Sequence, residues 1–394
     1  MTPTYFEYQN AVKLLCGEAA LDRIADELRH MGATCPMMLS DAVLTKLGVP
    51  GSVADAMAAE GCPVAAMYTD IPVDSSLEVV NRIAAEYRRH ACDAVVAVGG
   101  GSVIDTAKGV RLVLSQDKDD ILSLSGVENI LRGRHIPFVV VPTTAGTGSE
   151  CTGVAVIRND AQGVKMEFLS PFVEPDVAVL DVRMTQRLPA RATAATGMDA
   201  LVHALEACSC LQNNPLSYAH GTCALRLIVQ HLERAVRHGG DRDARLAMAM
   251  AATQAGIAFS NSMVGAVHAI GHALGGVCHV PHAEAMTILL PHVMRCNLSK
   301  AGAAYAELLP YVVGWEAAAA VPAADRAEAL IAAVERLAAT LHELTGLPLR
   351  LSDVGVQACD FERIAEGAVN DGALIVNPRM LSREQVVDIL KAAL

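Results

Sequence analysis

The chain has 394 residues, of which 52% are hydrophobic and 19% are charged. This length is too great for one ordinary hydrophobic core, so we expect two globular domains, and the composition excludes an intrinsically disordered chain. The net charge of −12 and the scattered basic residues argue against nucleic acid or an anionic membrane as a partner.

The chain is expected to act in the cytoplasm. Its start, MTPTYFEYQN, has neither the basic residues nor the apolar core of a secretory signal. No run of about 18 apolar residues predicts a membrane span. The eleven cysteines lie mostly in apolar periodic segments, which is typical of free thiols in a reducing compartment.

Residues 1–187 alternate short apolar runs with amphipathic helical patterns, such as those at 18–32 and 76–91. The runs predict buried strands at CPMML (35–39), PVAAMY (63–68), DAVVAV (93–98), PFVVVP (137–142) and VAVL (177–180). This alternation predicts an α/β domain with a parallel sheet that is covered on both faces. The segment VAVIRNDAQGVKMEF (154–168) predicts an inserted hairpin, with NDAQG as its turn.

Residues 188–394 have a long, alanine-rich helical pattern and predict an all-α domain. Helix starts with a capping residue are expected after NNP (213–215), GGD (239–241), NLS (297–299) and LS (381–382). No low-complexity linker separates the two domains. Because small ligands usually bind in clefts between domains, we expect the active site there.

Two glycine-rich turns follow predicted strands. In DAVVAVGGGSVIDTAKGV the turn Gly99-Gly100-Gly101-Ser102 leads into a helix, whose N-terminal N–H groups suit a pyrophosphate. In VVVPTTAGTGSE small and hydroxyl residues follow a second strand, at the sheet edge where nucleotides gather. Taken alone, this second turn is also consistent with an ordinary polar loop.

Asp41 follows the first predicted strand, in CPMMLSD. Its carboxylate is suited to a ribose 2′-hydroxyl and would repel a 2′-phosphate, which favours NAD over NADP. However, Asp41 precedes the glycine turn, whereas the usual acidic residue follows it by about 20 residues. Spacing alone therefore leaves a ribose contact and an unrelated role equally open.

The helical half concentrates possible metal ligands. Asp199 and His203 are four residues apart in TGMDALVHALEA, and so are His268 and His272 in VHAIGHALGG. Side chains with this spacing share one face of a helix, and His282 follows Pro281 after a glycine-containing loop. A carboxylate with several imidazoles in apolar surroundings suits Fe²⁺ or Zn²⁺.

These motifs resemble the iron-containing alcohol dehydrogenase family. The resemblance rests on GGGSVIDTAK, VPTTAGTGSE, ATGMDALVHALEA, FSNSMVGAVHAIGHALGG, VPHAEAMTILLPHVMRCN and VNPR, in this order over almost the whole chain. It implies a Rossmann-like NAD(P) domain, an all-helical domain, a metal in the cleft between them, and a homodimer or larger homo-oligomer. The implied metal ligands are Asp199, His203, His268 and His282. The implied nucleotide contacts are Asp41, Asp74, Gly99, Gly100, Gly101, Ser102, Thr143, Thr144, Thr147 and Lys165.

The resemblance places His272 near the substrate and the nicotinamide. It is the nearest candidate for exchanging the alcohol proton, with a water chain or a ribose hydroxyl as alternatives. Asp105 either forms a helix ion pair with Lys108 or contacts the nicotinamide side of the cofactor. The residues expected around the substrate carry little charge, which favours a small aliphatic alcohol, diol or aldehyde: Cys151, Val154, Phe259, Met263 and His272.

Three other functions remain open at this point. One is a zinc-dependent polyol dehydrogenase, because an aspartate with three histidines suits zinc as well as iron. Another is a transhydrogenase that passes hydride between a hydroxyacid and an oxoacid on tightly held NAD. The last is a non-catalytic module that binds metal and nucleotide; the intact set of histidines argues against it.

Overall fold

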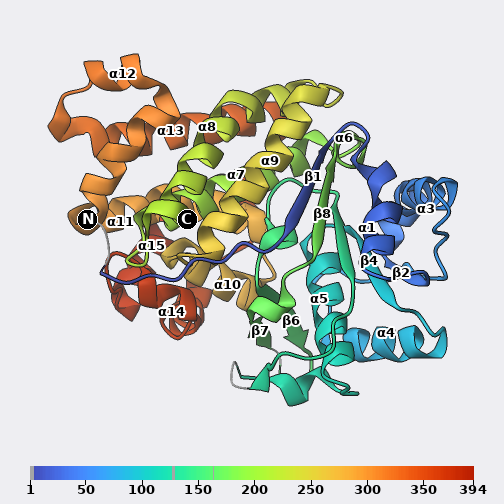
Figure 1. Cartoon of the computed structure of the whole chain (residues 1–394). Coiled ribbons are helices and arrows are strands. Elements are labelled where there is room, and N and C mark those ends of the chain that lie inside the picture. Colours follow the sequence, from blue (N-terminus) through green and yellow to red (C-terminus); the bar gives the residue numbers. More distant parts are fainter. Residues whose placement is uncertain (1–3, 127–128, 163) are drawn as a thin grey trace. The chain divides into compact units, whose positions relative to one another are not determined.

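The computed structural model describes residues 4–126, 129–162 and 164–394 (Figure 1). Its backbone divides into two compact units. One comprises residues 9–187, and the other comprises residues 188–394 together with residues 4–8 of the N-terminal segment. Among the described helices, none is both long enough and apolar enough to cross a bilayer.

The first unit is built on a six-stranded parallel sheet with the strand order β1-β8-β5-β4-β2-β3. Its strands are β1 (Lys13–Gly17), β2 (Pro36–Leu39), β3 (Ala66–Tyr68), β4 (Ala94–Gly99), β5 (Phe138–Pro142) and β8 (Val177–Asp181). Side chains alternate between the two faces, so Val95 and Ala97 enter one core while Val96 and Val98 enter the other. The predicted parallel sheet, buried on both faces, is confirmed.

Helices cover both faces of this sheet. They are α1 (Ile24–His30), α2 (Ala42–Lys46), α3 (Val49–Ala59), α4 (Leu77–Arg89), α5 (Gly101–Ser115) and α6 (Val182–Thr185). The predicted hairpin is confirmed as the antiparallel pair β6 (Val154–Asn159) and β7 (Val164–Leu169). Its predicted turn, NDAQG, includes Gly163, which lies outside the described residues.

The second unit is helical in the described residues, which confirms the predicted fold class. Its helices are α7 (Ala190–Ser209), α8 (Pro215–Arg237), α9 (Arg242–Ser260), α10 (Ala266–Cys278), α11 (His282–Val313), α12 (Trp315–Ala320), α13 (Arg326–Thr345), α14 (Phe361–Val369) and α15 (Arg383–Ala393). Three predicted caps are confirmed, since the side chains of Asn214, Asp241 and Ser382 accept backbone N–H groups at the starts of α8, α9 and α15.

The helix start predicted at residues 297–299 is wrong, because α11 runs without interruption through this segment. The amide of Asn297 does not cap a helix. It is buried and exchanges two hydrogen bonds of 3.0 Å with the side chain of Asn377. A capping residue type therefore signals a helix start only where its side chain has no better partner elsewhere in the fold.

Close packing of α7 against α8 depends on Gly197. A Cβ atom there would lie 2.3 Å from Cδ1 of the fully buried Leu232. We expect Gly197→Ala to lower the free energy of unfolding by about 1–3 kcal/mol through overpacking. The matched control, Gly302→Ala, adds a methyl group into open space on α11 and should raise it by about 0.4–1 kcal/mol. Denaturant titration measures the free energy of unfolding of both variants. An unchanged free energy of unfolding in Gly197→Ala would contradict the close packing at this position.

Candidate metal centre and nucleotide-binding turn

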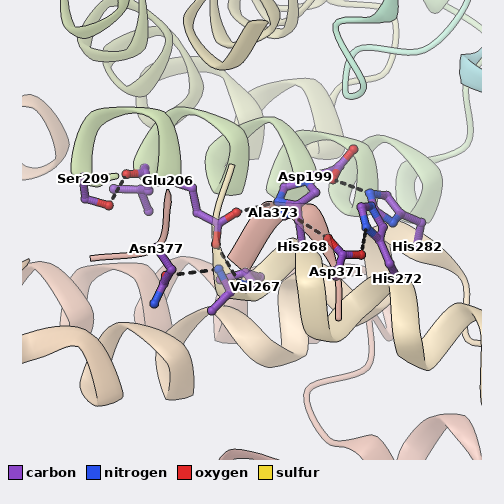
Figure 2. A network of polar contacts seen from close by, with 12 residues as sticks. Asp199, Glu206, Ser209, Val267, His268, His272, His282, Asp371, Ala373 and Asn377 are labelled. Carbon is purple, nitrogen blue, oxygen red and sulfur yellow. Dashed lines mark hydrogen bonds and ion pairs between the residues drawn. The ribbon is translucent and has the colours of Figure 1, made fainter. Parts of the chain in front are cut away.

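Three helices of the second unit bring three of the four predicted metal ligands together: Asp199, His268 and His282 (Figure 2). Asp199 and His203 lie one turn apart on α7, and His268 and His272 lie one turn apart on α10. His282 is the first residue of α11, directly after Pro281 at its N-cap. Asp199, His203 and His268 are buried, although their side chains are polar.

The ligand atoms of Asp199, His268 and His282 all lie within 4.8 Å of one another. The Asp199 Oδ1 to His282 Nε2 distance is 3.5 Å. Neither Oδ1 of Asp199 nor Nε2 of His268 has a hydrogen-bond partner in the described structure, and both atoms are buried. Unsatisfied buried polar atoms are costly, so the donor set of a carboxylate and imidazoles fits a divalent cation.

His203 does not belong to this group of three. Its ring stacks on the ring of His268, with the centroids 4.6 Å apart, and on Phe259 at 4.5 Å. The imidazole is therefore next to the centre, but its role as a fourth ligand stays a prediction.

Burial controls the ionisation of the centre. It raises the pKa of Asp199 to about 7, against the opposing charge of His272. Burial, together with the smaller effect of the charge of His272, lowers the pKa of His268 to about 3. Both shifts disfavour the charged forms of these side chains because the surroundings are apolar. A bound cation would supply the positive charge that favours the Asp199 carboxylate.

His272 lies beside the three converging ligands. Its ring centroid is 5.9 Å from that of His268 and 5.6 Å from that of His282. Nδ1 of His272 is 2.9 Å from Oδ2 of Asp371. Burial opposes ionisation of Asp371, but the hydrogen bond and charge of His272 outweigh it and lower the pKa of this carboxyl. Asp371 therefore acts as the acceptor and His272 Nδ1 as the donor.

Sequence reasoning missed three side chains around the centre: Glu206, Asp371 and Asn377. Glu206 lies 2.6 Å from His268 Nδ1, and Asn377 accepts the N–H of Ala266 at 3.1 Å. A signal existed for Glu206, since it follows Asp199 by seven residues and therefore shares its helix face. For Asp371 and Asn377 the contacts are far apart in the sequence. Asn377 lies in the VNPR motif, but the motif did not indicate its contacts, and no local pattern indicated Asp371.

In the first unit, β4 ends at Gly99 and α5 begins at Gly101, as the glycine-turn motif predicts. A Cβ atom at Gly100 would lie 3.3 Å from the Thr144 side chain, and one at Gly101 would lie 3.0 Å from that of Thr147. The N–H of Thr143 donates to the carbonyl of Gly99 at 3.0 Å. The structure thus places the two predicted turns side by side at the carboxyl ends of β4 and β5.

Asp74, Ser102 and Lys165 are also brought together. The N–H of Asp74 donates to Ser102 Oγ at 3.2 Å, and Lys165 Nζ lies 2.7 Å from Asp74 Oδ1. Asp74 has a positive φ of 53°, which is uncommon for a residue other than glycine. Three predicted nucleotide contacts from separate segments therefore adjoin the start of α5.

Asp41 is the N-cap of α2. Its Oδ1 accepts the N–H groups of Val43 and Leu44, each at 2.8 Å. The residue follows β2, which lies beside β4 in the sheet. Capping employs one carboxylate oxygen, so it is compatible with the predicted ribose contact.

Asp105 and Lys108 belong to a buried polar cluster on α5. Asp105 accepts the hydroxyl of Ser149 at 2.5 Å and the N–H of Val156 at 3.0 Å. Nζ of Lys108 donates to Ser149, to Thr152 and to the carbonyl of Val154. The two charged groups are 3.9 Å apart, so their ion pair is looser than these hydrogen bonds. Their contacts fix the segment that follows β5 and the start of β6.

Comparison with known proteins covers both units. Residues 11–182 match the profile of the iron-containing alcohol dehydrogenases. Residues 193–394 match the profile of the C-terminal part of the Fe-containing alcohol dehydrogenase family. Together these two matches extend over almost the whole chain.

Individual relatives agree with these matches. An NAD-dependent methanol dehydrogenase of Bacillus methanolicus is 36% identical over 383 residues, 96% of this chain and 97% of its own. A 1,3-propanediol dehydrogenase of Citrobacter freundii is 38% identical over 307 residues, 78% of this chain and 77% of its own. A crystal structure of 1,3-propanediol oxidoreductase superposes with a TM-score of 0.94 at 34% identity, covering 99% of this chain and all of the other.

Proposed function

Because this chain belongs to the iron-containing alcohol dehydrogenase family, a family of NAD-dependent alcohol and diol oxidoreductases, we propose that it interconverts a small aliphatic alcohol or diol and the corresponding aldehyde. The observation that carries the proposal is the convergence of Asp199, His268 and His282 within 4.8 Å. The buried, unsatisfied atoms of Asp199 and His268 support a metal-dependent reaction more strongly than any single motif does.

Asp199, His268 and His282 would hold the metal, and His203 would complete the set as the fourth ligand. Bound iron supplies a Lewis acid that polarises the oxygen of the substrate. One carboxylate and three imidazoles suit zinc equally well, so the same residues would hold either ion. The apolar surroundings of Asp199 and His268 exclude water and strengthen electrostatic interactions at this place.

The nucleotide would bind at the start of α5. Bound NAD supplies the nicotinamide that accepts or donates the hydride. The pyrophosphate would lie against Gly100 and Gly101, where the N-terminal N–H groups of α5 would bind it. Asp41 would hold a ribose 2′-hydroxyl and disfavour NADP. Thr143, Thr144, Thr147, Ser102, Asp74 and Lys165 would complete the binding surface.

We assign the transfer of the alcohol proton to His272. Asp371 accepts from Nδ1, so Nε2 is the nitrogen that would take up or release the proton. The carboxylate of Asp371 also stabilises the imidazolium that forms, since its lowered pKa keeps it ionised. Asp105 would contribute to the reaction indirectly, because it accepts hydrogen bonds from Ser149 and Val156 and so fixes their positions.

The substrate class rests on the uncharged character of the expected pocket residues. Phe259 stacks directly on His203, which places an apolar ring beside the metal centre. The relatives named for methanol and 1,3-propanediol support the same class.

The reaction is tested with metal-depleted protein to which Fe²⁺, Zn²⁺ or Mn²⁺ is restored separately. We expect NADH oxidation with short aldehydes to return with one ion and to exceed NADPH oxidation. Absence of turnover with every ion, despite NADH binding, would contradict the dehydrogenase and favour a transhydrogenase or a non-catalytic module.

Asp41 provides a separate prediction about the choice of nucleotide. Asp41→Ser should improve NADPH binding relative to NADH by about tenfold, or about 1.4 kcal/mol, because the repelling charge is lost. Serine is as good an N-cap as aspartate, so stability should hold, whereas Asp41→Ala should cost about 1 kcal/mol. Fluorescence titration with both nucleotides measures the ratio, and an unchanged ratio in both variants would exclude Asp41 from the ribose site.

We further propose that the enzyme is a cytoplasmic homodimer or larger homo-oligomer. All eleven cysteines are free thiols in the described structure, which supports a reducing compartment. Light scattering of the purified chain tests the assembly, and a monomeric mass at micromolar concentration would contradict it.

A further inference from the structure

We propose that Glu206 is a positioning residue for the metal centre, which selects the tautomer of His268 that can bind a metal. The inference rests on the proposed function, since it concerns a ligand of the same centre. In the neutral imidazole one ring nitrogen carries the proton and the other carries the lone pair. By accepting a hydrogen bond from the N–H of Nδ1, Glu206 leaves the lone pair on Nε2.

The geometry around Glu206 supports this role (Figure 2). Oε2 lies 2.6 Å from Nδ1 of His268, and both side chains are buried. Nε2 of His268 has no hydrogen-bond partner among the described residues. The ring is thus held through one nitrogen while the other is left for the metal. Partners of this kind fix the orientation and raise the basicity of metal-binding histidines.

The second oxygen of Glu206 has its own partner. Oε1 accepts the N–H of Val267 at 2.7 Å, a group at the start of α10 that has no acceptor within the helix. Both carboxylate oxygens therefore act as acceptors. The same side chain holds the helix and the histidine that the helix carries.

The start of α10 is shaped to admit this contact. A Cβ atom at Gly265 would lie 3.0 Å from Glu206 Oε1 and 2.9 Å from Asn377 Oδ1. Asn377 accepts the neighbouring N–H of Ala266. Two side chains from distant segments thus replace an ordinary N-cap, and only Glu206 also contacts the metal ligand.

Glutamine at position 206 would oppose the required tautomer. Its amide has one acceptor oxygen, whereas Glu206 accepts from two donors. If that oxygen accepts from Val267, the amide NH₂ faces Nδ1 of His268 and favours the proton on Nε2. If it accepts from His268, the NH₂ faces the N–H of Val267. The first arrangement disfavours the metal-binding tautomer directly. The second keeps this tautomer but repels the N–H of Val267, which disturbs the start of α10 and the position of His268.

The test measures the dissociation constants of Zn²⁺ and Co²⁺ by competition with a chromophoric chelator. We expect Glu206→Gln to weaken binding by about 10–100-fold. Two controls accompany it. Glu174→Gln replaces another buried carboxylate, in the first unit, and should leave binding unchanged. Asn377→Ala removes an anchor of α10 without touching His268, so it should lower the thermal midpoint but change binding less than about threefold.

The outcomes separate this inference from the proposed function. Tight metal binding by the parent protein with equal binding by Glu206→Gln would overturn the inference alone. Equal losses in Glu206→Gln and Asn377→Ala would also overturn it, by indicating helix anchoring only. Failure of the parent protein to bind any metal would contradict the proposed function itself.

A measurement on the parent protein keeps the proposal testable even if Glu206→Gln does not fold. In zinc-loaded protein with ¹⁵N-labelled histidine, we expect His268 to show a protonated Nδ1 and a metal-bound Nε2. Ligation through Nδ1 would overturn the role of Glu206.

Discussion

Asp199→Asn is expected to lower kcat for alcohol oxidation about 10³-fold, because it removes the anionic ligand that helps to hold the metal. Lewis-acid stabilisation is worth several kcal/mol, and about 4 kcal/mol corresponds to this factor. The carboxylate is buried and lies 3.5 Å from His282, so an isosteric amide tests its charge with little change in shape. Steady-state kinetics of the purified variant measures the fall in kcat, and elemental analysis measures the loss of bound metal.

The matched control is His292→Gln, which removes a partly buried imidazole from α11, the helix that also carries His282. Its kcat and metal content should stay within about twofold of the parent protein. Activity that persists in Asp199→Asn after the metal is lost would contradict a metal-dependent reaction. NADH binding should be retained, which separates loss of the metal from unfolding.

Gly101→Val is expected to weaken NADH binding about 10²-fold, or by about 2.7 kcal/mol. A Cβ atom at this position already lies 3.0 Å from the side chain of Thr147, and the two further methyl groups would cover the start of α5. The pyrophosphate would then lose its N–H donors. Titration of NADH fluorescence measures the effect, and the metal content should be unchanged.

Gly51→Val serves as the control for this substitution. Gly51 is an exposed position of α3 in the same unit, with no atom near an added Cβ. The substitution Gly51→Val introduces the same valine side chain into a helix of the same unit, but at a position where no ligand is proposed to bind. Equal nucleotide affinity in Gly101→Val and Gly51→Val would exclude the glycine turn from the nucleotide site.

The buried strands were predictable because their sequences are apolar throughout. β2, β4, β5 and β8 lie within the predicted runs or within one residue of them. β1 (Lys13–Gly17) was not predicted, since all five of its residues are exposed or half-buried at the edge of the sheet. An edge strand of this kind has no distinctive pattern, and its pairing with β8 depends on a partner more than 150 residues away.

Helix faces allowed the metal ligands to be grouped in pairs. The spacing of Asp199 and His203, like that of His268 and His272, places each pair on one face of a helix. However, the spacing does not show which member of a pair binds the metal. The structure brings His268 into the converging group and gives His272 a hydrogen bond to Asp371 instead.

Periodicity and residue type thus predict elements and candidate side chains, because both are properties of neighbouring residues. They do not predict which atoms meet. The partners of His268 and His272 lie 62 and 99 residues away in the sequence, and the N–H of Ala266 finds its acceptor at a separation of 111 residues. Such contacts form only when separate helices pack. The contacts of α10 with Glu206 on α7 and with Asp371 after α14 therefore decide which histidine nitrogens remain for a metal.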